Sequence, residues 1–251
     1  MVRSALVAQV VLSTTLLAAC AGGAPITLNA VGASPDQPQF DPFGYSASPS
    51  SGARQVIANP TLEDVMKPGP LPEMSVGRAD APVTIIKYAS LTCPYCRQFQ
   101  LTTYPQLKRE YIDTGKVRLI IREFPIGFQS GAATIALRCA PPERYFELYE
   151  KFLSQQGAWV SQEVRRDPIF KIASQVGLSR AKFDACYENQ GMIGALNAVK
   201  DRGRTLGVIG TPNFFVNGRL IKTVIGMKEI REIADPIVAG RAPLAGTATA
   251  N

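Results

Sequence analysis

The chain has 251 residues, 46% of them apolar, and a mean hydropathy of +0.03, which is typical of one globular domain with accessory segments. Its formal net charge is +7, but no basic block is interleaved with aromatic residues, so the composition does not favour nucleic-acid binding. The five cysteines are accompanied by no histidine, and we therefore expect no metal site.

Residues 1–19 are predicted to be an export signal peptide. A short basic start is followed by an almost wholly apolar run, and residues 17–20 read Leu-Ala-Ala-Cys. This tetrapeptide resembles the bacterial lipobox, in which the cysteine, here Cys20, is lipidated and anchors the protein through several acyl chains. Alternatively, residues 19–21 fit an Ala-x-Ala cleavage site that releases a soluble protein. We expect a periplasm-facing lipoprotein of the bacterial envelope, in the outer or inner membrane.

Residues 20–73 are predicted to be a flexible tether. Most of this segment is rich in Pro, Gly, Ser and Ala, and it cannot bury enough apolar surface to offset the entropy lost on ordering. A short helix is expected within residues 54–66, because Asn59 is a suitable cap and Pro60 suits the first helical position. The folded domain should begin near Met74.

The most informative stretch joins a strand to a pair of cysteines. Residues 83–89 form an apolar, strand-like run, and Cys93 and Cys96 follow at the start of a helix predicted over residues 94–111. A Cys-x-x-Cys at a helix N-terminus is typical of a dithiol redox site, because the unpaired N–H groups of the first turn stabilise a thiolate. Pro94 fits this position, since its missing N–H would have had no partner.

Two alternatives compete with a redox role for this motif. One is half of a zinc site, but structural zinc needs four ligands, and the chain has neither a histidine nor a second Cys-x-x-Cys. The other is an inert structural disulfide. The preceding strand and Pro94 favour redox chemistry over both.

The remaining elements complete an α/β order. A strand over residues 117–124 follows the active-site helix, which we expect to bend at Pro105, and this spacing is typical of a βαβ unit with parallel strands. An Asn-Gly hairpin over residues 210–221 and a helix over residues 227–239 end the domain. Between them, helices are predicted over residues 130–140, 143–156, 168–176, 179–188 and 191–206.

This order predicts a thioredoxin-like fold whose two halves are separated by an all-helical domain. The first half contributes a βαβ unit and the second a ββα unit. We place the N-terminal half at residues 74–127, the helical insert at 128–207, the C-terminal half at 208–240 and a frayed tail at 241–251.

Two motifs carry a resemblance to a known family. Residues 88–96 read Tyr-Ala-Ser-Leu-Thr-Cys-Pro-Tyr-Cys, and residues 210–218 read Gly-Thr-Pro-Asn-Phe-Phe-Val-Asn-Gly. Together, in this order, they resemble the DsbA-like thiol:disulfide oxidoreductases of the bacterial envelope, over roughly residues 74–240. The resemblance implies that Pro212 is cis and lies against the active-site disulfide, where the Thr211 backbone pairs with an extended substrate. The alternative is an ordinary trans proline that opens a strand.

The resemblance also implies an activity. A Cys93–Cys96 disulfide would accept electrons from a substrate thiolate through a mixed disulfide at Cys93, so the leading hypothesis is a dithiol oxidase acting on reduced or unfolded exported proteins. Such an enzyme would be a monomer without a cofactor, bind substrate partly through Pro94 and Tyr95, and be reoxidised by a DsbB-type membrane partner. The alternatives are a disulfide reductase or isomerase, and a non-catalytic surface lipoprotein that serves as a binding module.

Two positions depart from the family pattern. The spacer Pro94-Tyr95 contains no histidine, so we expect a site less oxidising than DsbA itself, whose potential is about −120 mV. Six residues before Cys93, where many members have a buried acid, this chain has Lys87. We expect Lys87 to pair with an acid such as Glu123 or to extend its amine to water.

A second disulfide is predicted within the insert. In an oxidising envelope, the five cysteines less a lipidated Cys20 leave two pairs. Cys139 and Cys186 would then join two insert helices, and some alphaproteobacterial members of the family look similar here. The alternative is a pair of buried free thiols.

Overall fold

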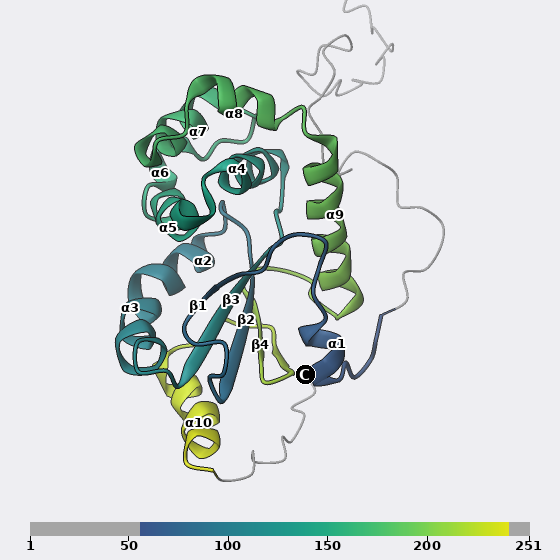
Figure 1. Ribbon diagram of the computed structural model, residues 1–251, viewed down its shortest axis with the longest axis vertical. Helices are drawn as coiled ribbons and strands as arrows, with labels where there is room; N and C mark the ends of the chain where they lie inside the picture. Colours follow the sequence, from purple (N-terminus) through teal and green to yellow (C-terminus); the bar gives the residue numbers. More distant parts are fainter. Residues whose placement is uncertain (1–55, 241–251) are drawn as a thin grey trace, which may run out of the picture. The chain divides into compact units, whose positions relative to one another are not determined.

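The structure is a computed structural model that describes residues 56–240 (Figure 1). The predicted signal peptide, Cys20, the first part of the predicted tether and the tail at residues 241–251 lie outside the described residues. Across residues 56–240, none of the helices combines the length and the apolar character needed to cross a membrane.

Within the described residues, five strands form one mixed sheet in the order β1-β3-β2-β4-β5. The strands β2 and β3 are parallel, which confirms the βαβ unit, and the other neighbouring pairs are antiparallel. The sequence did not predict the edge strand β1, because its three residues are too few to show a period. The bounds are β1 Met74–Val76, β2 Val83–Ala89, β3 Val117–Glu123, β4 Asn213–Val216 and β5 Arg219–Ile221.

Both faces of the sheet are covered, so its central strands carry apolar side chains on both sides. Along β2, Ile85 packs in a core with the insert and the active-site helix, whereas Ile86 and Tyr88 pack in a second core. On β4, Phe214 packs in the first core and Phe215 in the second, because successive side chains of a strand point to opposite faces. The sheet is therefore the middle layer between two cores.

The active-site helix begins at Pro94, as predicted, and continues through alternating α- and π-helical segments. Pro105, where a bend is expected, lies in the short α3 between two π-helical segments and has no N–H to donate. The N–H of Tyr104 reaches the carbonyl of Phe99, five residues back. The bounds are α2 Pro94–Gln98, the π-helical Phe99–Thr103, α3 Tyr104–Leu107 and the π-helical Lys108–Ile112.

The helical insert packs against itself and against the active-site helix. Its helices α4, α5, α7 and α8 contact one another, and α5 also contacts α2 (Figure 1). The helix α9 differs, because it packs against β3 and brings Gly203 close to the Tyr88 ring. The last helix of the predicted insert therefore covers the sheet. The bounds are α4 Phe128–Cys139, α5 Tyr145–Ser154, α6 Gln156–Trp159, α7 Arg166–Ala173, α8 Arg180–Cys186 and α9 Gln190–Thr205.

The C-terminal half contains the predicted hairpin and closing helix. Asn217 and Gly218 occupy the turn between β4 and β5 with φ angles of 43° and 88°, the left-handed backbone that an Asn-Gly pair accommodates. The Asn217 side chain also accepts a hydrogen bond from the N–H of Thr84 at 2.7 Å, which ties the hairpin to β2. The closing helix α10 (Met227–Val238) then packs against β2.

The last part of the segment predicted as a flexible tether, residues 20–73, contains a helix that packs on the domain. Thr61, rather than Asn59, is the N-cap of helix α1 (Leu62–Met66). Val65 of this helix is fully buried in the second core, on the sheet face away from the active-site helix. Met66 of the same helix also packs against this core. The folded domain therefore begins before α1, because apolar side chains anchor this helix in a core that the sequence did not reveal.

Cys139 and Cys186 form a disulfide that joins the C-terminal ends of α4 and α8. Their Cα atoms are 6.2 Å apart, although 47 residues separate them in sequence. A bond across so long a loop restricts the unfolded chain and thereby stabilises the folded one.

Replacing Cys139 and Cys186 together by alanine is expected to lower the free energy of unfolding by about 2–4 kcal/mol, because this restriction is lost. Urea unfolding of the two proteins measures the difference. Both proteins also carry Cys96→Ala, so that no Cys93–Cys96 disulfide contributes to the measured stability. Equal stabilities would refute a stabilising bond. Labelling of Cys139 and Cys186 in the parent by a thiol reagent, after denaturation without reductant, would show that the bond is absent.

Candidate active site

Cys93 is the N-cap residue of the active-site helix. Its backbone is extended, with φ −73° and ψ 121°, and its sulfur accepts a hydrogen bond from the N–H of Cys96 at 3.4 Å. The helix begins here because Pro94 occupies its first position. The first-turn N–H groups therefore point at the Cys93 sulfur and favour its negative charge.

The two cysteines, which are both free thiols in this structure, differ in their exposure to solvent. Cys93 is partly exposed and Cys96 is fully buried. The pKa of Cys93 is lowered to about 6, first by the neighbouring Cys96 thiol and further by the N–H groups of Cys96 and Tyr95, against the effect of partial burial. Burial raises the pKa of Cys96 well above its usual value. The pair thus combines an accessible thiolate with a shielded thiol.

In the reduced protein, the ultraviolet absorbance of the Cys93 thiolate is expected to appear with a midpoint near pH 6. Because the pKa is lower in the folded than in the unfolded chain, the ionised sulfur stabilises the fold above the unfolded pKa, and this contribution is lost as the pH falls through about 6. Cys96→Ala should raise the midpoint, since it removes the main cause. A midpoint at the usual cysteine pKa of about 8.5 would contradict the assignment.

The loop before β4 brings Thr211 and Pro212 to the Cys93 sulfur. The peptide bond between them is cis. In its thiol form, Cys93 donates a hydrogen bond from Sγ to the Thr211 carbonyl at 3.0 Å, across 118 residues of sequence. This bond is available only to the protonated sulfur and opposes ionisation, but the donors around Sγ outweigh it. Pro94 and Tyr95 lie in the first helical turn beside this point, and Tyr95 is 59% exposed.

Gln156 also supports the active-site loop, and no sequence signal pointed to it. From α6, its buried Nε2 donates hydrogen bonds to the carbonyls of Leu91 at 2.7 Å and Cys93 at 3.1 Å. Nearby, the hydroxyls of Ser90 and Ser130 are 2.7 Å apart and join the loop to α4. The insert therefore holds the loop that carries Cys93, through residues that belong to no motif.

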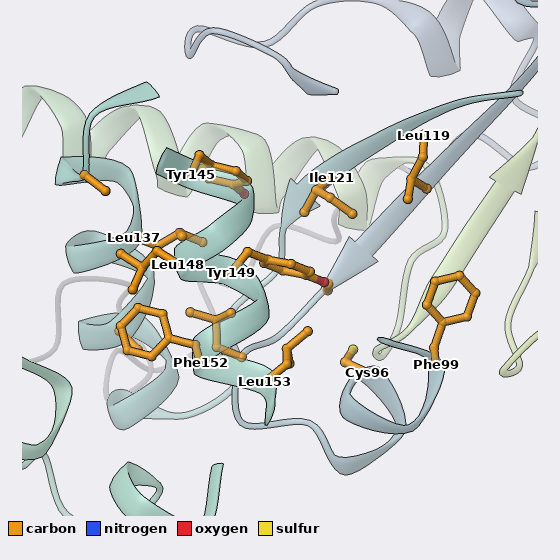
Figure 2. Close-up of a cluster of buried hydrophobic side chains, with 14 of the residues drawn as sticks. Cys96, Phe99, Leu119, Ile121, Leu137, Tyr145, Leu148, Tyr149, Phe152 and Leu153 are labelled. Atoms are coloured by element: carbon orange, nitrogen blue, oxygen red, sulfur yellow. The ribbon is translucent and has the colours of Figure 1, made fainter. Parts of the chain in front are cut away.

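Neither expectation for Lys87 is correct. Lys87 is fully buried and does not reach water, and among the described residues its Nζ has no hydrogen-bond partner. Instead, Nζ lies 4.3 Å from the centroid of the Phe99 ring and 5.6 Å from that of Tyr149. Figure 2 shows Tyr149 projecting from α5 towards the sheet, with Cys96 and Phe99 on the neighbouring active-site helix.

Glu123, the acid expected to pair with Lys87, binds the helical insert instead. Arg138 of α4 donates to its carboxylate through Nε and through Nη2, the latter at 2.8 Å, and the Tyr145 hydroxyl of α5 donates at 2.8 Å. Exposed fractions are only 8% for the Arg138 side chain and 4% for that of Glu123. The bidentate pair joins the end of β3 to α4, and the Tyr145 hydroxyl joins it to α5.

Comparison with known proteins identifies the family. A family model described as Thioredoxin matches residues 71–235, which include both active-site cysteines and Pro212. Over 156 residues the chain is 30% identical to disulfide bond formation protein D of Bacillus anthracis, covering 59% of this chain and 71% of that protein. The chain belongs to the thioredoxin family, in its DsbA-like branch.

Two further similarities fit this DsbA-like assignment. Over 173 residues the chain is 32% identical to a protein named as a protein-disulfide oxidoreductase in Rickettsia conorii; the match covers 67% of this DsbA-like chain and 62% of the relative. The crystal structure of Wolbachia pipientis alpha-DsbA1 is similar with a TM-score of 0.65 and 24% identity, covering 72% and 97% of the two chains. This likeness confirms the thioredoxin-like fold with a helical insert.

Proposed function

We propose that this DsbA-like protein is a thiol:disulfide oxidoreductase that works as a dithiol oxidase. The observation that carries the proposal is the partly exposed Cys93 sulfur, placed at the N-terminus of α2 above the buried Cys96, with a pKa lowered to about 6. A stabilised thiolate favours the reduced pair, so the oxidised pair readily accepts electrons. The names of the Rickettsia and Bacillus relatives support the same chemistry.

The catalytic cycle passes two electrons from substrate to enzyme. A substrate thiolate attacks Sγ of Cys93 in the oxidised pair, the bond to Cys96 breaks, and the departing Cys96 sulfur takes up a proton. A second substrate thiolate then attacks the substrate sulfur of the mixed disulfide, and Cys93 departs as a thiolate. The substrate gains one disulfide and the enzyme becomes a dithiol. The lowered pKa of Cys93 makes it a good leaving group in the second step.

The same pKa supports a moderate oxidising power. A value of about 6 for Cys93 lies between that of thioredoxin, about 7, and that of DsbA, about 3.5. The spacer Pro94-Tyr95 supplies no histidine that would stabilise the thiolate further. We therefore propose a potential less oxidising than the roughly −120 mV of DsbA.

The proposed substrates are reduced or unfolded exported proteins. Exposed apolar side chains lie on the segments next to Cys93: Tyr95 is 59% exposed, Ile126 48% and Ile209 78%. Unfolded chains present apolar side chains that fit such a surface. We propose that an extended substrate segment pairs with the Thr211 backbone there, beside Pro212 and the first turn at Pro94.

The remaining proposals rest on the sequence. Residues 1–19 and the Leu-Ala-Ala-Cys motif support export and lipidation of Cys20 at the bacterial envelope, facing the periplasm. There the protein would act as a monomer without a cofactor and be reoxidised by a DsbB-type membrane partner. Incorporation of a labelled fatty acid that is lost in Cys20→Ser would support the anchor; equal labelling of both would overturn it.

The activity is tested with the oxidised protein and a reduced, unfolded substrate that needs its disulfides to function. Recovery of substrate activity together with loss of the Cys93–Cys96 disulfide is the expected result. Reduction of insulin without oxidation of the reduced substrate would indicate a reductase, and neither activity would indicate a binding module; both outcomes overturn the oxidase. In cells, rapid thiol trapping should find the pair oxidised at steady state.

A further inference from the structure

Lys87 occupies the centre of the sheet, directly behind the redox pair. It lies on β2, where its register partners are Ile121 of β3 and Phe214 of β4. Its side chain is fully buried, and Nζ faces the Phe99 and Tyr149 rings without a hydrogen bond to any described residue. The mechanism proposed above gives this amine no role.

The active-site pair is the source of negative charge that acts on this amine. Burial lowers the pKa of Lys87 to about 8 by favouring the neutral amine, and negative charge at the pair Cys96 and Cys93 opposes this effect. The neighbouring apolar surface comes from Phe99, which follows Cys96 by one helical turn and packs on Phe214 at a centroid distance of 5.0 Å. Aromatic faces attract a cation but do not remove the cost of its burial.

Other titratable groups around Lys87 supply no compensating charge. Burial raises the pKa of Tyr149 on α5 well above its usual value and that of Tyr104 on α3 to about 12, so both stay neutral. The carboxylate of Glu123 on β3 is held by Arg138 of α4. The helix α10, which also packs against β2, buries only the apolar Ile230 and Ala234.

The charge available to Lys87 therefore depends on the redox state of the pair. In the dithiol form, the Cys93 thiolate compensates a buried ammonium. In the disulfide form, both sulfurs are neutral, and a buried ammonium would be left without any anion. A lysine responds to such a loss by releasing its proton.

We propose that Lys87 is the redox-linked proton carrier of the site, an uncharged amine when Cys93 and Cys96 are bonded and an ammonium when they are reduced. This inference rests on the proposed dithiol chemistry. When a substrate dithiol is oxidised, its two electrons break the Cys93–Cys96 bond. One of its two protons binds the Cys96 sulfur and the other binds Lys87, which leaves a thiolate at Cys93 and a net charge of zero.

Proton uptake by Lys87 makes the protein more oxidising as the pH falls below the pKa of about 8 in the reduced form. We expect the equilibrium constant for reduction by glutathione to be about tenfold higher in the parent than in Lys87→Met at pH 7, and equal in the two at pH 9. Because both proteins are measured against glutathione, the ratio of their equilibrium constants does not depend on the titration of glutathione itself. Methionine keeps the length of the side chain and suits the apolar surroundings.

The pH dependence separates a proton carrier from a packing role. A ratio that is the same at both pH values, or a ratio of one throughout, would overturn the proposal. Tyr149→Phe is the matched control, because it removes a hydroxyl that is also buried and unpaired among the described residues; its ratio to the parent should not change with pH. If the parent fails to exchange with glutathione at all, the proposed function itself is wrong.

A second measurement needs no substitution. A water-soluble phosphine reduces the disulfide by supplying two electrons and, with water, two protons. At pH 7, Cys96 and Lys87 should retain both protons, so that a pH-stat records almost no release. Release of one proton for each disulfide reduced would show that the protonation state of Lys87 does not change on reduction. This result would overturn the proposal even if Lys87→Met does not fold.

Discussion

Replacing Cys93 by serine is expected to reduce oxidation of a reduced substrate to the uncatalysed rate. Serine cannot form a disulfide, and its hydroxyl is not ionised near neutral pH, so neither the electron acceptor nor the mixed disulfide exists. Recovery of activity by a reduced, unfolded substrate measures the loss. The fold should be retained, because Cys93 is partly exposed and its N-cap position suits serine.

Two matched variants define this loss. Cys96→Ser keeps the Cys93 thiolate, so it should accumulate mixed disulfides when mixed with a disulfide-bonded substrate, visible on a non-reducing gel. The Cys139→Ala/Cys186→Ala double variant should keep its rate at a temperature where it is folded, because this disulfide lies in the insert helices α4 and α8. Oxidation of the substrate by Cys93→Ser at the parent rate would show that Cys93 is not the redox-active cysteine.

Replacing Glu123 by alanine is expected to lower the free energy of unfolding by about 3–5 kcal/mol. The substitution leaves the buried Arg138 guanidinium without its carboxylate and removes the acceptor of the Tyr145 hydroxyl. It also removes the hydrogen bonds that join the end of β3 to α4 and α5. Urea unfolding of the oxidised protein measures the effect.

Asp167→Ala provides the control for this prediction. It removes an ion pair with Arg180 of similar length, 2.7 Å, but the two side chains are 72% and 51% exposed. Solvent and salt screen such a pair, so we expect no measurable change in stability. Equal effects of the two substitutions would show that burial does not set the strength of the Glu123 contact.

The elements that sequence predicted well are those whose signal is local. The run over β2 directs apolar side chains to two cores because both sheet faces are covered, and the Asn217-Gly218 turn follows from its two left-handed residues. Pro94 and the Cys-x-x-Cys marked the helix start at the redox pair. The edge strand β1 had no such signal, since three residues show no period.

The sequence by itself determined the chemistry of this protein: a pair of cysteines at a helix N-terminus, and a second motif far along the chain. The tertiary structure alone decided which groups surround that pair. In the folded protein, Lys87 is buried without a hydrogen-bond partner among the described residues, and Glu123 pairs with Arg138. Gln156 donates a hydrogen bond to the loop that carries Cys93. The physical reason is that a local pattern sets backbone conformation, whereas desolvation and pairing depend on residues that meet only when distant segments pack together.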